Sequence, residues 1–357
     1  MQRIVFLIYH GMGHFNACLK PAKTLRSQYE VIFSGHIYFE KYVEEQGFPF
    51  YALKSVPFGL GFEPWMNKIE KKKNIWWHSL KDRWRDRLYH DRKNELIKML
   101  EETEPNYILI DSWQSTDFIV LYQHLKSRSI KVAFIQTMVS SVIERGLPPL
   151  NSLAQPGNRS EIENAHQHYY NQQFRKKLIG KLKFFGRVND TLIKTKIREN
   201  HIPEKYLSNQ LSLFSPGFSR VDEFILSPLE FDFPSAGAPH QHYIGFMTDN
   251  SRIEVTDTAY LKLDRAIRLK LKETEAALIY CSFGTVSYED MRSVREFLKK
   301  LINIAKEQNC VLIISSNAID QASTNDLPEN VYVFKVVPQL QVLTLASVMI
   351  THGGLNS

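Results

Sequence analysis

Short apolar runs rich in β-branched residues alternate along this chain with longer stretches of helical character. Such alternation is typical of a parallel sheet flanked by helices, because parallel strands need crossover connections and helices usually supply them. Strands are predicted in two series, the first at residues 3–9, 30–33, 48–53, 107–110, 131–136 and 223–226, and the second at residues 276–282, 310–315, 331–336 and 348–351. The chain is therefore predicted to be an α/β protein with two doubly wound, Rossmann-like units.

The length also favours two domains, because 357 residues exceed the roughly 250 to 300 residues at which a single hydrophobic core stops growing. Residues 231–252 separate the two strand series and contain Pro234, Gly237, Pro239 and Gly245, which are typical of a connection. We predict domains at residues 1–245 and 246–357.

Charge and composition exclude several classes of protein. The net charge of +7 comes from 45 basic and 38 acidic residues, a mixture that argues against a nucleic-acid-binding protein and fits an anionic small substrate or a membrane surface better. Cys18, Cys281 and Cys310 lie far apart without a CxxC spacing, so neither a disulfide framework nor a zinc site is predicted. We expect buried, reduced thiols and no bound metal.

The first apolar run, residues 4–9, is too short for a membrane span or a signal peptide, so a cytoplasmic location is expected. Two basic stretches with aromatic residues leave peripheral membrane contact open as an alternative. Residues 63–98 hold four tryptophans among eleven Lys/Arg and six Asp/Glu, and residues 175–198 surround Phe184 and Phe185. The favoured interpretation is a solvated charged face with the aromatic side chains packed inward.

The loop after the first strand reads His10-Gly11-Met12-Gly13-His14, and a helix is predicted over residues 15–27. A dinucleotide site is not supported, because Asn16 takes the place of the third glycine and the second strand leads into His36 without a carboxylate for a ribose. The loop instead offers an imidazole, His14, beside glycines that would let another molecule approach closely. Histidine is a natural general base near neutral pH.

A carboxylate, Asp111, follows the predicted strand 107–110 at the same sheet edge as His14. One interpretation is that Asp111 caps the following helix. The other is that it orients His14 and stabilises the imidazolium, as in a base and orienter pair. The presence of both residues favours the second.

The second strand series carries its own polar loops. Phe283-Gly284-Thr285 forms a small turn whose hydroxyl can donate to phosphate, and Pro338 and Gln339 follow another strand. The sequence ends in Thr351-His352-Gly353-Gly354-Leu355-Asn356-Ser357, a pattern that predicts a diphosphate site at the start of a helix.

Five segments in order, GMGHFNACLKPAKTL, LIDSW, YCSFGTVS, VVPQLQVL and THGGLNS, resemble the UDP-glycosyltransferase-type family, which includes plant, macrolide and carotenoid natural-product glycosyltransferases. The resemblance implies the GT-B fold, two Rossmann-like domains facing across a cleft. It further implies that residues 1–245 bind the acceptor and that residues 246–357 form a partial nucleotide-sugar domain. In this family the nucleoside-diphosphate sugar is a co-substrate, so no cofactor is expected.

The resemblance also assigns roles to single residues. It implies that His14 is the acceptor-activating base and Asp111 its orienting acid. The implied donor-binding residues are Gly13, Gly284, Thr285, Val337, Gln339, His352, Gly354, Asn356 and Ser357, with Val337 and Gln339 at the nucleobase. Val336 takes the place of the base-stacking tryptophan of plant members, so weaker base stacking is expected and the preference for UDP over TDP has less support from the sequence.

The implied activity is inverting transfer of a hexose, from UDP-glucose by preference, to a hydroxyl of a small lipophilic acceptor. Met138, Pro148 and Pro149 are candidate walls of an acceptor pocket, or equally members of the domain core. The family's later acidic residues for the donor have no counterpart before Ser357, so we expect a C-terminally truncated sequence that is poorly active alone, with apolar faces uncovered near residues 343–350. The alternatives are a GT-B-like epimerase, a cell-wall N-acetylglucosaminyltransferase and a non-catalytic binding fragment.

Overall fold

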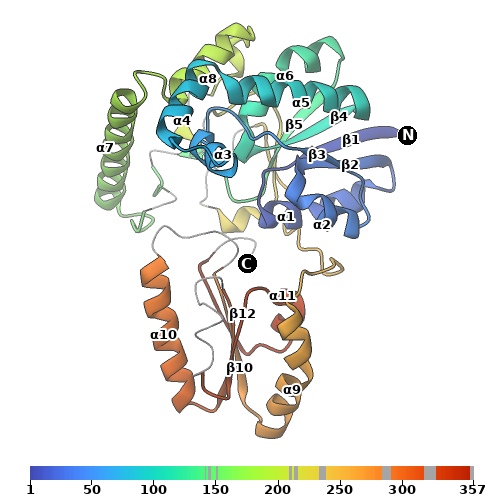
Figure 1. The fold of residues 1–357 in the computed structure, drawn as a ribbon, viewed down its shortest axis with the longest axis vertical. Coiled ribbons are helices and arrows are strands. Elements are labelled where there is room, and N and C mark those ends of the chain that lie inside the picture. The colour runs from blue at the N-terminus through green and yellow to red at the C-terminus, as the bar shows by residue number, and fades with distance from the viewer. Residues whose placement is uncertain are drawn as a thin grey trace. The chain divides into compact units, whose positions relative to one another are not determined.

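The computed structural model describes residues 1–140, 142–143, 146–149, 152–208, 211–212, 216–232, 239–283, 291–316 and 327–353 (Figure 1). The chain divides into two compact units. The first unit comprises residues 1–10 and 17–247, and the second comprises residues 11–16 and 248–357.

The first unit is built on a sheet of seven described strands in the order β3-β2-β1-β4-β5-β8-β9, with every neighbouring pair parallel. The strands are β1 Gln2–Leu7, β2 Tyr29–His36, β3 Phe50–Leu53, β4 Tyr107–Asp111, β5 Lys131–Gln136, β8 Glu223–Ile225 and β9 Gln241–Tyr243. In register, Leu7 lies opposite Ser34 and Ile110, so the carboxyl ends of β1, β2 and β4 meet at one edge. A separate antiparallel pair joins β6 Val142–Ile143 to β7 Leu211–Ser212.

Helices cover both faces of this sheet. They are α1 Met12–Leu25, α2 Glu40–Glu45, α3 Glu63–Ile69, α4 Ile75–Trp84, α5 Arg87–Thr103, α6 Thr116–Ser127, α7 Arg159–Lys183 and α8 Asn189–Glu199, with short 3₁₀ turns at Ile37–Phe39, Ser112–Gln114, Glu204–Tyr206 and Leu229–Phe231. One core joins α5, α6 and α8 to the sheet through buried residues such as Leu96, Ile119 and Ile193. Helices α1 and α2 lie on the opposite face (Figure 1).

The second unit has a four-stranded parallel sheet in the order β12-β11-β10-β13. Its strands are β10 Ala277–Ser282, β11 Cys310–Ser315, β12 Val331–Phe334 and β13 Val348–Thr351, and its helices are α9 Thr258–Thr274, α10 Met291–Glu307 and α11 Gln339–Leu343. Helices α9 and α10 lie on opposite faces of the sheet (Figure 1), each over its own apolar core. This two-sided cover makes the unit doubly wound.

All ten predicted strands are present, which confirms the α/β prediction. Strand β9 was not predicted, because it has only three residues and lies in the stretch read as a connection. Near residues 343–350 the exposure is mixed: Val348 is half exposed, whereas Leu343, Leu345 and Met349 pack partly against the core.

The prediction that the first helix starts at residue 15 is wrong. Helix α1 begins at Met12, because the carbonyl of Gly11 accepts hydrogen bonds from the amides of His14 at 3.0 Å and Phe15 at 3.3 Å. Gly13 and His14 therefore lie in the first helical turn rather than in a preceding loop.

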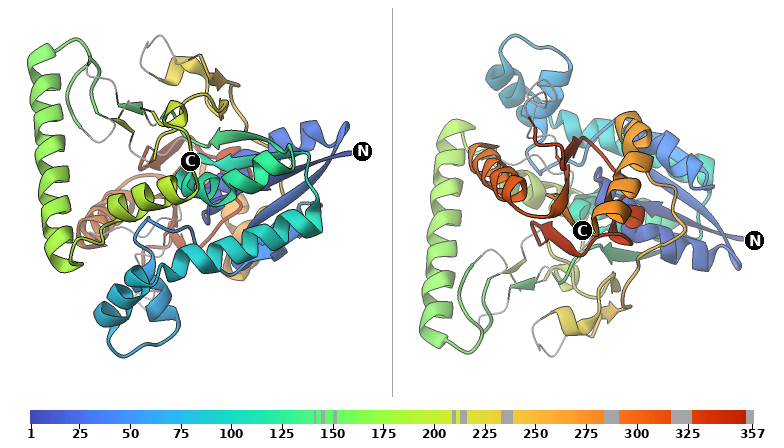
Figure 2. Two further views of the ribbon diagram at one scale, coloured as in Figure 1. Left: turned by 90° about the horizontal axis from the view of Figure 1, so that it is seen from above. Right: turned by 90° about the horizontal axis from the view of Figure 1, so that it is seen from below.

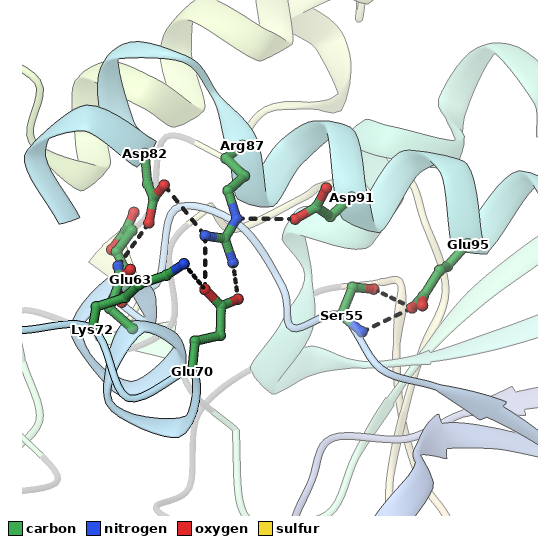
Figure 3. Close-up of polar contacts among 9 residues, drawn as sticks. Ser55, Glu63, Glu70, Lys72, Asp82, Arg87, Asp91 and Glu95 are labelled. Atoms are coloured by element: carbon green, nitrogen blue, oxygen red, sulfur yellow. Dashed lines mark hydrogen bonds and ion pairs between the residues drawn. The ribbon is translucent and has the colours of Figure 1, made fainter. Parts of the chain in front are cut away.

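The prediction that the aromatic residues of 63–98 pack inward and the charges face solvent is wrong for three of the four tryptophans and for four charged residues; Trp65 packs against the core, and the other charged side chains are exposed or half buried. Trp76, Trp77 and Trp84 are exposed. Several charged residues are buried instead, since each has a polar partner: the Arg83 guanidinium donates to Glu63 at 2.8 Å, and the neutral Asn67 amide donates to Asp82 at 2.7 Å. Figure 3 shows the more exposed continuation, in which Arg87 contacts Asp82, Glu70 and Asp91. These contacts fix α3 against α4 and α5.

A buried ion pair joins α5 to α6 directly behind the sheet edge. Arg92 donates to Asp117 from Nε at 3.0 Å and from Nη2 at 2.5 Å, and both side chains are almost fully buried. Arg92 Nη1 also donates to the carbonyl of Ser55 at 3.0 Å, just after β3. Gln114, which lies close to Arg92, donates to the carbonyl of Leu7 at the end of β1 at 2.8 Å. One guanidinium thus ties the ends of several elements together.

Replacing Arg92 by methionine is expected to destabilise the first unit by about 3 to 5 kcal/mol, because Asp117 would stay buried without a counter-charge. The five tryptophans of the chain all lie in the first unit, so urea unfolding followed by tryptophan fluorescence reports on it. Arg159→Met is the matched control, since Arg159 forms an exposed pair with Glu163 and should shift stability by less than about 0.5 kcal/mol. Equal midpoints for the two variants would contradict the prediction.

The loss of stability caused by Arg92→Met should also depend on pH. Burial raises the pKa of Asp117, and the charge of Arg92 opposes that rise. Without Arg92, the pKa of Asp117 in the folded protein moves further above its value in the unfolded chain. Folding then requires the carboxyl group to stay protonated, so the protein loses stability as the pH rises from the unfolded to the folded pKa. The difference between variant and parent is therefore expected to be smallest in acid and largest near neutral pH.

Candidate functional site

The candidate site of the first unit lies where β1 and β4 end side by side. Asp111 is the last residue of β4, pairs in register with Ile135 of β5 and is completely buried. Its carboxylate accepts a hydrogen bond from the amide of Trp113 at 2.9 Å and another from the amide of Tyr9 at 3.3 Å. The capping interpretation is thus confirmed for the 3₁₀ turn after β4, and the same carboxylate also holds the segment that follows β1.

Two neighbouring groups respond to the charge of Asp111. Burial raises the pKa of the Tyr9 phenol to about 12, and the nearby Asp111 carboxylate adds to the rise. Burial raises the pKa of the Cys18 thiol well above its usual value, again with a contribution from Asp111. Because Cys18 is four residues after His14, both side chains lie on the same side of α1. This side of α1 therefore carries His14 and a thiol that is close enough to Asp111 to respond to its charge.

His14 is positioned by the backbone beneath it. A Cβ atom at residue 11 would lie 2.9 Å from Cδ2 of the His14 ring, which is closer than real Cβ atoms approach. Gly11 is therefore needed to leave room for the imidazole in this position. The glycine at residue 11 thus leaves room for the protein's own histidine, and the close approach of another molecule at these glycines stays a prediction.

Half-buried aromatic rings gather at the same sheet edge. The His10 ring contacts Tyr9 at 4.1 Å, Phe62 at 4.9 Å and Trp65 at 5.9 Å between ring centroids, and Tyr9 also contacts Trp113 at 5.5 Å. We call Tyr9, His10, Phe62, Trp65 and Trp113 the aromatic cluster. Phe62 and Trp65 also pack against the core, so they are both core residues and part of this edge.

His36 ends β2 beside the aromatic cluster, with its ring 5.9 Å from that of Trp65. Its Nδ1 accepts a hydrogen bond from the amide of Tyr38 at 3.4 Å, so this nitrogen carries no proton. Burial and the charge of Arg92 lower the pKa of His36. The position at which a dinucleotide fold would place a ribose-binding carboxylate thus holds a neutral imidazole.

Gln136, the last residue of β5, is a candidate that the sequence analysis missed. It is completely buried, and within the described part of the chain neither its side-chain nitrogen nor its oxygen has a hydrogen-bond partner. Buried amides are nearly always hydrogen-bonded, so this group is able to bind a polar atom of a ligand or a water. Its position at the end of an apolar strand was the available signal.

The carboxyl edge of the second sheet is lined with hydroxyl groups. In register, Ser282 of β10 lies opposite Ser315 of β11 and Thr351 of β13. His352 follows β13 and is exposed. Ser282 and Ser315 were not predicted as site residues, although each ends a predicted strand, whereas Thr351 begins the segment predicted to form a diphosphate site. This row of hydroxyls, with His352 beside it, suits an anionic ligand.

Val337 and Gln339 lie close in sequence but differ in environment. The Val337 side chain is buried in the core with Tyr260 and Phe334, so only its main chain is available to a ligand. Gln339 is half buried and begins α11. The carboxylate of Glu254 accepts a hydrogen bond from the amide of Leu340 at 2.9 Å and so already binds the start of this short helix.

Other predicted residues are placed less completely. Gly284, Thr285, Gly354, Asn356 and Ser357 lie outside the described residues. Pro148 and Pro149 are buried and Met138 is half buried. The cysteines are free and buried, as predicted. Among the described residues, no helix is both long and apolar enough to cross a bilayer, and no group of three or more His, Cys, Asp or Glu suits a metal.

Two curated bacterial proteins resemble part of the sequence. Identity is 32% over 81 residues with an uncharacterized UDP-glucosyltransferase YojK of Bacillus subtilis (strain 168), a match covering 22% of this chain and 19% of that protein. It is 33% over 90 residues with the NDP-glycosyltransferase YjiC of the same strain, covering 25% of this chain and 22% of that protein. The matched segments thus span about a fifth of the length of these relatives. No protein-family model matches.

Solved structures resemble the chain over nearly its whole length. The glycosyltransferase of kitacinnamycin matches with a TM-score of 0.59 at 15% identity, covering 99% of this chain and 76% of that protein. The glycosyltransferase VinC in complex with DTDP matches with a TM-score of 0.52 at 13% identity and the same coverage. The rhamnosyltransferase SpnG complexed with spinosyn aglycone reaches 0.51 at 14% identity, covering 99% of this chain and 76% of that protein. These likenesses confirm the predicted GT-B type of fold with two Rossmann-like domains.

Replacing Asp111 by alanine is expected to destabilise the first unit by about 1 to 3 kcal/mol, because the amides of Tyr9 and Trp113 lose their acceptor. Asp111→Asn keeps one acceptor oxygen and should cost less. Asp91→Ala, which removes a half-exposed carboxylate from the surface of α5, is the matched control and should change the urea midpoint little. An alanine variant as stable as this control would show that Asp111 does not hold the segment after β1.

Proposed function

We propose that this protein transfers a sugar from a nucleoside-diphosphate sugar to a hydroxyl group of an acceptor. The local similarity to two bacterial UDP- and NDP-glycosyltransferases and the shared fold support this proposal. The observation that carries it is Asp111, a fully buried carboxylate that grips the segment leading into the helix of His14. That arrangement provides an acid to orient a base at the edge where α/β proteins bind ligands.

In the proposed reaction, His14 removes the proton of the acceptor hydroxyl while its oxygen attacks the anomeric carbon of the sugar. The new carbon–oxygen bond forms as the bond to the diphosphate breaks, and the diphosphate leaves with the electron pair. Attack from the side opposite the leaving group inverts the anomeric configuration. Asp111 stabilises the imidazolium that forms on His14.

The donor is proposed to bind at the carboxyl edge of the second sheet, with UDP-glucose as the first choice. Hydroxyls stabilise a departing diphosphate by donating hydrogen bonds to its oxygens. Ser282 and Thr351 supply hydroxyls at this edge, and His352 follows directly. The Ser315 hydroxyl beside them donates to the carbonyl of Lys335 at 3.3 Å. The main chain of Val337 and the side chain of Gln339 are proposed to contact the base. Thr285, Asn356 and Ser357 remain proposed diphosphate ligands on the strength of the sequence resemblance, and so do Gly13, Gly284 and Gly354 for the donor.

The acceptor is proposed to be lipophilic, because the sheet edge at which Asp111 lies also carries the half-buried aromatic cluster. Tyr9 has a pKa of about 12 and His36 a lowered pKa, so both are neutral at neutral pH. Stacked and edge-on rings favour a flat or apolar ligand over a charged one. A polar atom of the ligand could bind the Gln136 amide.

His14→Ala is expected to lower kcat/KM by about 10² to 10⁴, the usual contribution of a general base. The test uses the complete open reading frame of the gene, with UDP-glucose and a panel of lipophilic alcohols, and measures glycoside formation by mass spectrometry. Asp111→Asn should lower kcat, and adding it to His14→Ala should cost little more, because the two residues act as a unit. His90→Ala, which changes an exposed histidine of α5, is the control. Equal rates for His14→Ala and His90→Ala would overturn the base assignment, and absence of transfer would overturn the proposed activity.

Gly11→Ala tests the position of the imidazole without removing it. The added Cβ would clash with the His14 ring, and a displacement of about 1 Å of a catalytic group can cost about 10² in rate. We therefore expect a lower kcat with little change in stability. Gly146→Ala is the matched control, because no atom lies within 4 Å of a Cβ built there. A Gly11→Ala enzyme with parental kcat would show that this close contact does not position the base.

A further inference from the structure

The C-terminal half of α7 leaves four large apolar side chains exposed on one side. Phe174 is 69%, Leu178 50%, Ile179 63% and Leu182 74% exposed. At about 100° per residue, these four side chains lie within an arc of about 140° on the helix. We call Phe174, Leu178, Ile179 and Leu182 the α7 stripe.

The opposite side of α7 is the side that packs against the protein. A Cβ at Gly180 would lie 3.1 Å from Val188, and Lys177 forms an ion pair with Asp190 of α8 at 2.7 Å. The ring of Phe184, which ends the helix, lies under the Arg83 guanidinium at 4.1 Å. By helical geometry these positions lie opposite the stripe. Both views of Figure 2 show α7 at the periphery of the first unit.

Positive charge borders the α7 stripe. Arg175, Lys176, Lys181 and Lys183 are exposed, and none of them forms an ion pair within the described part of the chain. The sequence has no Asp or Glu between Glu163 and Asp190, and Asp190 is already paired with Lys177 and Lys194. Arg175 lies within the arc of the stripe, Lys176 and Lys183 lie beyond one edge of it, and Lys181 lies beyond the other. The stripe is therefore apolar apart from Arg175 and has lysines on both sides.

We propose that the α7 stripe docks this protein onto an anionic lipid bilayer. The helix would lie in the interface with its apolar side chains among the acyl chains and its lysines at the phosphate groups, an arrangement that stable amphipathic helices adopt. A polyanion such as a nucleic acid would meet the lysines but leave the apolar side chains in water. A bilayer satisfies both, because its headgroups are negative and its interior is apolar. This proposal does not depend on the proposed sugar transfer.

Co-sedimentation with vesicles tests the docking. The chain is expected to pellet with vesicles made of equal parts phosphatidylcholine and phosphatidylglycerol, and to stay in the supernatant with phosphatidylcholine alone. High salt should release it, since lysine–headgroup attraction is screened. A chain that stays in the supernatant with the anionic vesicles would overturn the proposal.

The stripe variant Phe174→Ser/Leu178→Ser/Leu182→Ser is expected to bind the anionic vesicles at least about tenfold more weakly, because it removes most of the inserted apolar area. Leu261→Ser/Leu269→Ser is the matched control: both leucines are exposed on α9 of the second unit, and this variant should bind like the parent. Circular dichroism melts check that each variant is folded. If the stripe variant does not fold, Lys176→Glu/Lys181→Glu/Lys183→Glu provides the same test through charge.

Two results would overturn the assignment to α7. One is parental binding by the stripe and charge variants, or an equal loss in the α9 control. The other is a parent protein that is dimeric by analytical ultracentrifugation and does not bind the vesicles, together with a stripe variant that is monomeric. That result would assign the stripe to contact between copies of the chain.

Discussion

The buried pair between Arg92 and Asp117 is the constraint on which the geometry of the first unit depends. An arginine at this depth is tolerated only when its donors are satisfied, and here the partners are a carboxylate at the start of α6 and the carbonyl after β3. Through Gln114 the same region reaches the end of β1. The ends of β1 and β3 and the start of α6 are therefore fixed by polar contacts in the interior. A purely apolar core would not specify these positions as narrowly, because apolar contacts lack direction.

Asp111 has a structural role and a proposed chemical role, and both require the same position at the sheet edge. Its hydrogen bonds to main-chain amides hold the segment after β1 and start the turn after β4. Burial raises the pKa values of Tyr9 and Cys18, and the charge of the same carboxylate adds to both rises. Because the carboxylate of Asp111 is hydrogen-bonded to the backbone that leads into α1, its charge keeps a fixed position relative to that helix. This double use explains why a costly buried carboxylate suits this edge.

The sequence predicted the strands well and the site only in part. Parallel strands are short, apolar and β-branched, so the run at residues 310–315 is visible without any tertiary information. The start of α1 was missed because Gly11 and Gly13 suggested a loop, whereas the carbonyl of Gly11 begins the helix. The inward packing of Trp76 and Trp77 was also predicted wrongly. Composition shows that charges are present, but it does not show that Glu63 and Arg83 neutralise each other inside. The orphan amide of Gln136 likewise depends on neighbours distant in sequence.

The location of Cys18 gives the proposed base an unreactive neighbour. Oxidants and alkylating agents attack the thiolate form of cysteine, and both complete burial and the charge of Asp111 disfavour that form here. The carboxylate that would support an imidazolium on α1 thus also suppresses the nucleophile one turn away. A helix that carries a histidine and a cysteine on one side could otherwise be damaged by peroxide at the point where its alignment matters most. The low reactivity of Cys18 toward oxidants thus follows from its burial and from the nearby charge of Asp111.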